Sequence, residues 1–205
     1  MRILPAVGGW EDDLVFRQNF ISKKHVEDNG GVVIGVAEPL IEKEFISATQ
    51  QVCRYDRNVF GESGFSVAMW IKGDYSTGTN TLLDTSPAGS RTFISIEGTG
   101  IIYLKINNSA SVNMGAYAAW SGFYDVNEWN SLVITGLDSS NTLVSYVNGN
   151  QITSTAATAW TAGVVTSLFI GNTNTLSQST IKRMREVKIW KRVLTLEEIQ
   201  QLTVS

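Results

Sequence analysis

Alternating apolar and polar positions in short segments along the chain predict an all-β protein. In the clearest segment, FSVAMWIKG, alternate residues from Phe65 to Ile71 are apolar, and the other side of the same strand carries Ala68 and Trp70. A strand that is apolar on both sides and flanked by glycines is expected in the middle of a sheet, with packing on each face. The segment MREVKIWKRV, residues 184–193, alternates in the same way and is expected to lie in the same domain.

Further short strands recur between turn signals such as Asn148-Gly149, a pair favoured in tight reversals. These strands are predicted over residues 14–20, 32–34, 46–55, 82–83, 92–96, 101–106, 129–137, 142–147, 151–152 and 168–170. The fifth and sixth are expected to form one hairpin, and the seventh and eighth a second. The Ser/Thr/Ala stretch over residues 153–162 is interpreted as a loop.

One short C-terminal helix is predicted after Thr195. A threonine followed three residues later by Glu198 is the capping-box pattern, in which each side chain accepts a hydrogen bond from the backbone of the other residue. So short a helix is marginal alone, so we expect it to dock on the sheets. The predicted core combines its apolar side with the best strands: Val67, Met69, Trp70, Val133, Val144, Tyr146, Val187, Ile189 and Leu202.

Composition limits the domain count and the classes of partner. The chain has 205 residues, of which 43% are hydrophobic and 17% charged, which is enough for one large core. We expect residues 1–12 to form an N-terminal arm and residues 13–205 to form one domain. The net charge of −3 and the lack of a basic stripe argue against nucleic-acid binding, and the basic residues 182–192 are interpreted as the solvated side of a strand.

No segment is apolar over a length that would cross a membrane, and no signal peptide is seen. Membrane association is therefore not expected. The protein either stays where it is made, leaves the cell by lysis or as part of a particle, or has lost a leader. A virion or extracellular location is the prediction.

The C-terminal run resembles a known family. LFIGNTN, a short loop and IKRMREVKIWKRVLTLEEIQQL resemble the closing signature of laminin G-like, concanavalin A-like jelly-roll domains. WNSLVIT, SYVNGNQI and FSVAMWIKG resemble other strands of that family, and DLVFRQNF with VEDNGG resembles its opening strand and turn. The resemblance covers residues 13–203 and implies a jelly-roll sandwich of two antiparallel sheets, which agrees with the strand pattern.

One departure from the family concerns calcium. Arg185 stands before Glu186 where many members have an aspartate that helps to hold a calcium ion. Calcium binds six or more oxygen ligands, several of them carboxylates. Asp12, Asp13 and Asp28, with the neighbouring amide Asn29, could still form a site near the first turn, although acidic turn residues are more often simply solvated. No cofactor is therefore expected, with calcium as the alternative.

Catalysis is not expected. Enzymes on this fold cleave glycans with carboxylates that alternate along one strand. Glu97 stands alone, Glu186 is followed two residues later by Lys188, and the only histidine, His25, lies in a polar turn. The pattern gives no paired acid and nucleophile, so a glycoside hydrolase is the least favoured class.

Two classes of binding protein remain. A virion structural or attachment protein, such as a capsid decoration, head fibre or tail protein, would make protein or glycan contacts through its loops in a symmetric assembly or homo-oligomer. A free-standing carbohydrate-binding module would hold sugars with exposed aromatic and amide side chains. The sequence favours the first because a lone module without a catalytic partner domain is ordinary in a virion.

The candidate binding residues lie in the uncharged segment AYAAWSGFY, residues 116–124, which is predicted to be a projecting loop or flap. It concentrates four aromatic residues, Tyr117, Trp120, Phe123 and Tyr124, among small neighbours. The alternative is a lid folded over one end of the core. In that case Trp120 and Phe123 are expected to be covered, while the two tyrosines stay exposed. Trp10, in the N-terminal arm, is expected to contact a neighbouring subunit or its own domain.

Overall fold

In the computed structural model of the protein, the described residues are 14–19, 31–34, 52–56, 64–75, 78–86, 91–97, 99–106, 112–137, 142–156, 167–171 and 183–204. The predicted N-terminal arm over residues 1–12, including Trp10, lies outside them. So do His25 and the calcium candidates Asp12, Asp13, Asp28 and Asn29. The strand predicted from residue 46 is described only as β3, Val52–Tyr55.

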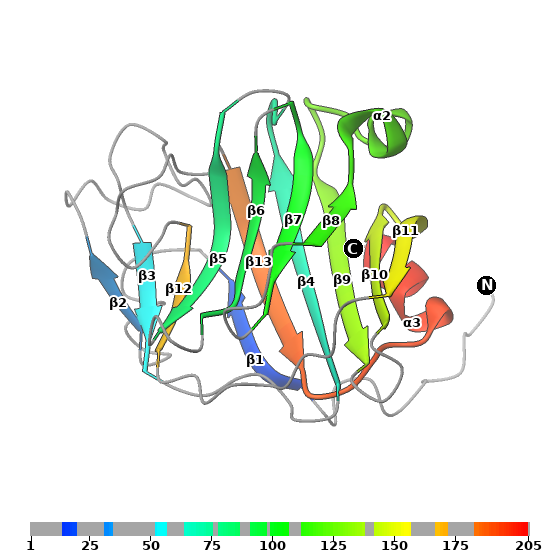
Figure 1. Ribbon diagram of the computed structural model, residues 1–205. Helices are drawn as coiled ribbons and strands as arrows, with labels where there is room; N and C mark the ends of the chain where they lie inside the picture. Colours follow the sequence, from blue (N-terminus) through cyan, green and yellow to red (C-terminus); the bar gives the residue numbers. More distant parts are fainter. Residues whose placement is uncertain are drawn as a thin grey trace, which may run out of the picture.

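Two antiparallel sheets pack face to face (Figure 1), which confirms the jelly-roll sandwich. The six-stranded sheet runs in the order β1 (Leu14–Asn19), β13 (Arg183–Trp190), β4 (Gly64–Lys72), β9 (Asn130–Leu137), β10 (Thr142–Val147) and β11 (Asn150–Ala156). The seven-stranded sheet runs β2 (Gly31–Ile34), β3, β12 (Ser167–Ile170), β5 (Asn80–Ser86), β6 (Phe93–Glu97), β7 (Ile101–Lys105) and β8 (Val112–Gly115).

Strand β4 lies in the middle of its sheet, as its two apolar sides predict. It pairs with β9 on one side and with β13 on the other, so the two segments that alternate most clearly in the sequence are hydrogen-bonded neighbours. In the ladder with β13, Val67 lies opposite Ile189 and Met69 opposite Val187. Both predicted hairpins, β6–β7 and β9–β10, are also present.

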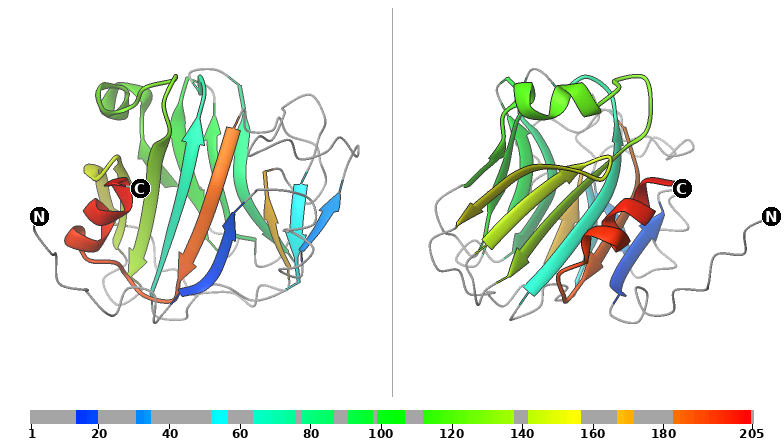
Figure 2. Two further views of the ribbon diagram at one scale, coloured as in Figure 1. Left: turned by 180° about the vertical axis from the view of Figure 1, so that it is seen from behind. Right: turned by 90° about the vertical axis from the view of Figure 1, so that its right-hand side faces the viewer.

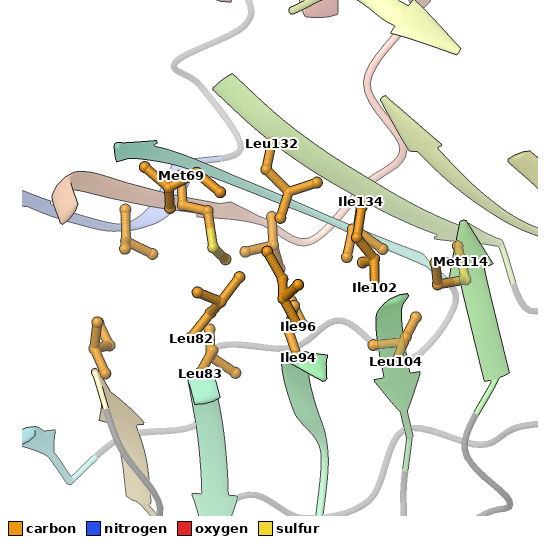
Figure 3. Packing of buried hydrophobic residues seen from close by; sticks show 14 of the residues in the cluster. Met69, Leu82, Leu83, Ile94, Ile96, Ile102, Leu104, Met114, Leu132 and Ile134 are labelled. Atoms are coloured by element: carbon orange, nitrogen blue, oxygen red, sulfur yellow. The ribbon is translucent and has the colours of Figure 1, made fainter. Parts of the chain in front are cut away.

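The main core fills the space between the sheets. Side chains of the six-stranded sheet, such as Met69, Leu132 and Ile134, point toward Leu82 and Ile96 of the seven-stranded sheet, and all five are at most 1% exposed (Figure 3). The predicted core is confirmed except at one position: the core residues named from the sequence are buried, but Val144 is only half-buried.

A second apolar cluster covers the outer face of the six-stranded sheet. Trp70 and Trp190 form its base, and the short helix α3 (Leu196–Gln201) packs Ile199 onto them, followed by Leu202 at the start of η5 (Leu202–Val204) (Figure 2). The predicted capping box is present: Glu198 N donates to Thr195 Oγ1 at 3.3 Å, and Thr195 N donates to Glu198 Oε2 at 2.8 Å. The docking helix is therefore confirmed.

Three local features differ from the sequence prediction. Strand β11 continues to Ala156 through the Ser/Thr/Ala stretch interpreted as a loop, because its backbone keeps pairing with β10 whatever its side chains favour. Strand β8 was not predicted. The segment predicted as a loop contains a four-residue helix, α2 (Tyr117–Trp120), and a 3-10 turn, η3 (Ser121–Phe123). Among the described residues, no helix is both long and apolar enough to cross a membrane.

Candidate functional site

The segment from Ala116 to Glu128, here called the flap, lies over the end of the sandwich at which β4 finishes and β9 and β13 begin (Figure 2). Trp120 is its anchor: the ring is 1% exposed, and Nε1 donates to the Gly100 carbonyl at 2.9 Å. The Trp120 ring meets Tyr117 and Tyr124 edge-on, with centroids 4.9 and 5.0 Å apart. Trp120 is therefore covered, as the lid alternative expected, and the exposed binding role predicted for it in a projecting loop is wrong.

The exposure predicted for the other three aromatic residues is wrong. Tyr117 and Tyr124 are half-buried against the core, whereas Phe123, which was expected to be covered, is 45% exposed. Tyr117 and Trp120 lie three residues apart in α2 and share one face of it. Tyr124 follows η3 in extended backbone, where its hydroxyl bonds the Gly73 carbonyl, and Phe123 at the end of η3 is left facing solvent.

Tyr124 fixes the flap to the end of β4. Its hydroxyl donates to the Gly73 carbonyl at 2.8 Å, and its ring meets that of Tyr75 edge-on at 6.2 Å. Burial raises the pKa of the Tyr124 phenol well above its ordinary value, and Tyr75 adds a smaller effect in the same direction. The hydroxyl thus stays a neutral donor and holds the flap in one position.

Two asparagines at the strand ends complete the attachment. Asn148, at a φ of 48°, accepts from Ser131 N at 2.8 Å and donates to the Phe123 carbonyl at 2.7 Å and to Asn130 Oδ1 at 2.9 Å. The Asn130 amide in turn donates to the carbonyls of Asp125 and Glu128, both at 2.7 Å. The flap is therefore pre-organised on a rigid base, as a binding surface requires.

A surface hollow of about 280 Å³ opens beside the flap. The described residues that line it are Lys72, Gly73, Val126, Asn127 and Arg183. Lys72 and Arg183 lie directly opposite each other where β4 ends and β13 begins. Val126 is 37% exposed, so the flap presents an apolar side chain at the hollow and a larger one, Phe123, three residues before it. The hollow and the exposed flap residues are together called the rim site.

The carboxylates singled out in the sequence do not meet. Glu97 lies in the seven-stranded sheet, where Ser95 Oγ donates to its Oε1 at 2.6 Å, and Glu186 lies in the six-stranded sheet, 3.2 Å from Lys188 Nζ. Glu186 and Lys188 lie on the outer face of their sheet, where the Lys188 ammonium lies 5.0 Å from the centre of the Trp70 ring. Two carboxylates in different layers of a sandwich cannot flank one glycosidic bond.

Arg185, which replaces the family's calcium-binding aspartate, has a different contact. Its guanidinium lies over the Trp129 ring, 5.3 Å from the ring centre. Such a contact places a cation where a calcium ligand was expected from the resemblance. In the part of the chain that the structure describes, no three His, Cys, Asp or Glu side chains converge as a metal site would need.

Comparison with known families decides the relationship. A family model described as the concanavalin A-like lectin/glucanases superfamily matches residues 47–200. The chain belongs to this superfamily. The laminin G-like, concanavalin A-like resemblance found in the sequence is thereby confirmed. A search of curated proteins found no match to the sequence.

Several solved structures are similar to the chain in fold at low sequence identity. Domain 4 of AbnA, an extracellular arabinanase from Geobacillus stearothermophilus solved with arabinotriose, has a TM-score of 0.66 and 16% identity, and the match covers 93% of this chain and 98% of that one. The binding domain of botulinum neurotoxin serotype D has a TM-score of 0.66 and 16% identity over 95% of this chain and 52% of its own. The receptor-binding domain of a botulinum neurotoxin mosaic serotype C/D has a TM-score of 0.65 and 17% identity, covering 85% of this chain and 45% of its own.

These similarities establish the fold. The chain spans about half the length of the two toxin domains and nearly all of the arabinanase domain. All three are parts of larger proteins, and two of them are described as binding domains. Membership of the superfamily thus establishes a lectin-like jelly-roll fold. The ligand of the rim site has to be inferred from the residues that form it.

Sequence reasoning found part of the rim site and missed the rest. It selected the flap through its aromatic residues, of which only Phe123 is exposed at the surface. It did not select Lys72, Asn127 and Arg183, because they come together only through the β4–β13 register and the turn after η3. One signal could have found Lys72: it stands at the end of β4, a strand that is otherwise largely apolar on both sides.

Proposed function

We propose that the chain is a non-catalytic recognition module that binds a glycan at the rim site. The observation that carries the proposal is the hollow beside the flap, which the hydrogen-bonding side chains of Lys72, Asn127 and Arg183 line together with Val126. The same flap carries the exposed Phe123, three residues before Val126. A small number of polar groups beside an apolar surface is typical of small-ligand sites. An exposed aromatic ring gives a sugar an apolar face to stack on.

The rigid attachment of the flap supports the proposal. Sites held in one geometry lose less conformational entropy on binding than mobile ones. Trp120, Tyr124 and Asn148 fix the flap through hydrogen bonds to three separate segments, so Phe123 and Val126 are presented without a large cost of ordering.

The proteins of similar fold support glycans as the first ligand class to test. The arabinanase domain was solved with arabinotriose, and a study of botulinum neurotoxin type C describes cell entry that depends on two ganglioside molecules. Because a botulinum neurotoxin DC binding domain was also solved with rat synaptotagmin II, a protein ligand is the alternative outcome of the test. The fold alone does not choose between them.

The placement of Glu97 and Glu186 in different sheets supports a module without hydrolase activity. A virion attachment role, with several copies in a symmetric assembly, fits a recognition module and is our proposal for its setting; an extracellular role as a free-standing lectin is the alternative. Proteomics of purified particles from the source would test the setting separately from the ligand.

A glycan array followed by calorimetry tests the function. Phe123→Ala is expected to weaken binding of the selected glycan about fivefold or more, as loss of a contact residue does. Leu137→Ala is the matched control, because Leu137 is also an exposed apolar residue, at 39%, and it lies at the opposite end of β9. Both variants should keep the wild-type melting temperature. A folded Phe123→Ala variant with unchanged affinity, or the absence of any glycan ligand, would refute the proposal.

A further inference from the structure

The turn between β10 and β11 contains the sequence pair in which asparagine loses its side-chain amide most readily, Asn148-Gly149. In that reaction the backbone nitrogen of the following residue attacks the asparagine Cγ atom, and a glycine in that position has no Cβ to obstruct the attack. Both residues lie in the left-handed region, at φ values of 48° and 75°, as a two-residue type I′ turn requires. The flap is attached to the sandwich through this same asparagine.

The amide group of Asn148 is occupied by the contacts that hold the flap. Its Oδ1 accepts from Ser131 N at 2.8 Å, and its Nδ2 donates to the Phe123 carbonyl at 2.7 Å and to Asn130 Oδ1 at 2.9 Å. Nδ2 is the atom that departs as ammonia when asparagine is deamidated. Both donated bonds must therefore break before the reaction can finish, and one of them is the attachment of the flap at Phe123.

The C-terminal segment restrains the same turn. A Cβ atom placed on Gly149 would lie 3.3 Å from Thr203 Cγ2 and 3.5 Å from Gln200 Cγ, so η5 and the end of α3 pack directly on this glycine. Ring closure between Asn148 and Gly149 requires the backbone to rotate out of the left-handed turn. With the flap bound to the asparagine side chain and the C-terminal segment packed on the glycine, that rotation needs a local opening of the structure.

We propose that Asn148 is a deamidation site that is protected while the flap is attached and reacts when the flap is released. In the released state a bond forms between Gly149 N and Asn148 Cγ, the Cγ–Nδ2 bond breaks, and ammonia leaves with the amide proton of Gly149. Water then opens the five-membered imide to aspartate or isoaspartate. Neither product can donate the bonds to the Phe123 carbonyl and Asn130 Oδ1, so the reaction makes release of the flap irreversible. This modification does not depend on which ligand the rim site binds.

Peptide mapping of the full chain by mass spectrometry tests the proposal. One sample is held native and one unfolded in guanidinium chloride, both in mildly alkaline buffer, and the peptide with residues 148–149 is resolved from that of the second Asn-Gly pair, residues 29–30. Deamidation at Asn148 should be at least tenfold slower in the native sample, because it requires local opening. Equal rates, or no reaction at Asn148 even in guanidinium chloride, would overturn the proposal.

Two variants separate release of the flap from unfolding of the whole chain. Tyr124→Phe removes the hydroxyl bond to the Gly73 carbonyl, an attachment of the flap that does not include Asn148, so it should raise the native rate at least threefold. Ile189→Val is the matched control, because it causes a similarly small loss of stability in the main core near the far end of β13. It should leave the native rate within about a factor of two, since it does not loosen the flap. No rise in Tyr124→Phe, or an equal rise in both variants, would show that the flap does not control the reaction.

Discussion

Asn148 holds the flap and the six-stranded sheet together, and replacing it tests whether the flap is a rigid part of the fold. Asn148→Gly keeps a residue that tolerates the φ of 48° but removes all three side-chain hydrogen bonds. Each such bond contributes about 0.5 to 1.5 kcal/mol net, and the bond to the Phe123 carbonyl, which is solvent-accessible, belongs at the low end. The expected loss is about 2 to 3 kcal/mol.

Asn148→Asp distinguishes the hydrogen bond that Asn148 accepts from the two that it donates. It keeps an oxygen that can accept from Ser131 N, but it replaces the two donated bonds with a carboxylate oxygen facing the oxygens of Phe123 and Asn130. The loss should match or exceed that of the glycine variant. Asn150→Ala is the control, because Asn150 is exposed and its amide bonds, 3.4 Å to the Val147 carbonyl and 3.1 Å to the Asn148 carbonyl, are local.

Thermal unfolding and hydrogen exchange measure these effects. For a chain of this size, about 1 kcal/mol corresponds to 2 to 4 °C, so both Asn148 variants should melt about 5 to 10 °C lower, and Asn150→Ala within about 2 °C of the wild type. Backbone amides of the flap should exchange faster in the Asn148 variants. Losses below about 0.5 kcal/mol in both would show that this asparagine does not hold the flap.

Three further predictions concern the core and the C-terminal helix. Ile189→Ala should cost about 2 to 4 kcal/mol in denaturant unfolding because Ile189 is 0% exposed in the main core, and an unchanged midpoint would remove β13 from it. Gly136→Ala should cost about 1 to 3 kcal/mol, since its Cβ would lie 2.9 Å from Phe65 Cζ in a filled core; wild-type stability would show that the ring can move aside. The Arg192 guanidinium, which donates to both oxygens of Glu198 at 2.8 Å, is the main cause that lowers the pKa of that carboxyl from 4.5 to about 2. A carboxyl whose pKa is lower in the folded state stabilises the fold at pH values above its unfolded pKa. The stability that Glu198 contributes should therefore be lost as pH falls from about 4.5 to about 2. In Arg192→Met the melting temperature should depend less on pH over that range.

Much of the fold could be predicted because its strands follow simple rules. The period-two patterns of β4 and β13 identified two strands of one domain, with β4 central, and the capping box located α3. These signals succeed because residues at a regular local spacing share one face of a strand or helix, and burial of that face fixes the element in place. The second apolar cluster also follows from the sequence, since only a strand covered on its outer face would carry Trp70 and Trp190 there.

The flap shows where local rules stop. Helix α2 is four residues long and its N-cap, Ala116, makes no side-chain hydrogen bond, so nothing in the sequence marks its start. Its conformation is set by tertiary contacts, chiefly those of Trp120 with Gly100 and of Tyr124 with Gly73. Which aromatic residue faces solvent depends on that conformation, and so the exposure of Phe123 could not be predicted.

The rim site was missed for a related reason. Lys72 and Arg183 are far apart in the sequence, and only the register of β4 against β13 makes them opposite neighbours. A single strand shows which face a side chain occupies, but not what lies across from it. The domain limits at residues 12 and 13 stay predictions, because the arm lies outside the described residues and the family match begins at residue 47.

The position of β13 also constrains how the chain reaches its folded state. The last described strand inserts between β1 and β4, so among the described strands β1 gains its hydrogen-bonded neighbour only when residues 183–190 have left the ribosome. Long-range pairing of this kind slows folding, because the chain loses the entropy of closing a long loop before the stabilising contacts between the strands form. Nascent chains arrested before residue 183 should therefore remain sensitive to protease, and protection should begin only when β13 is complete.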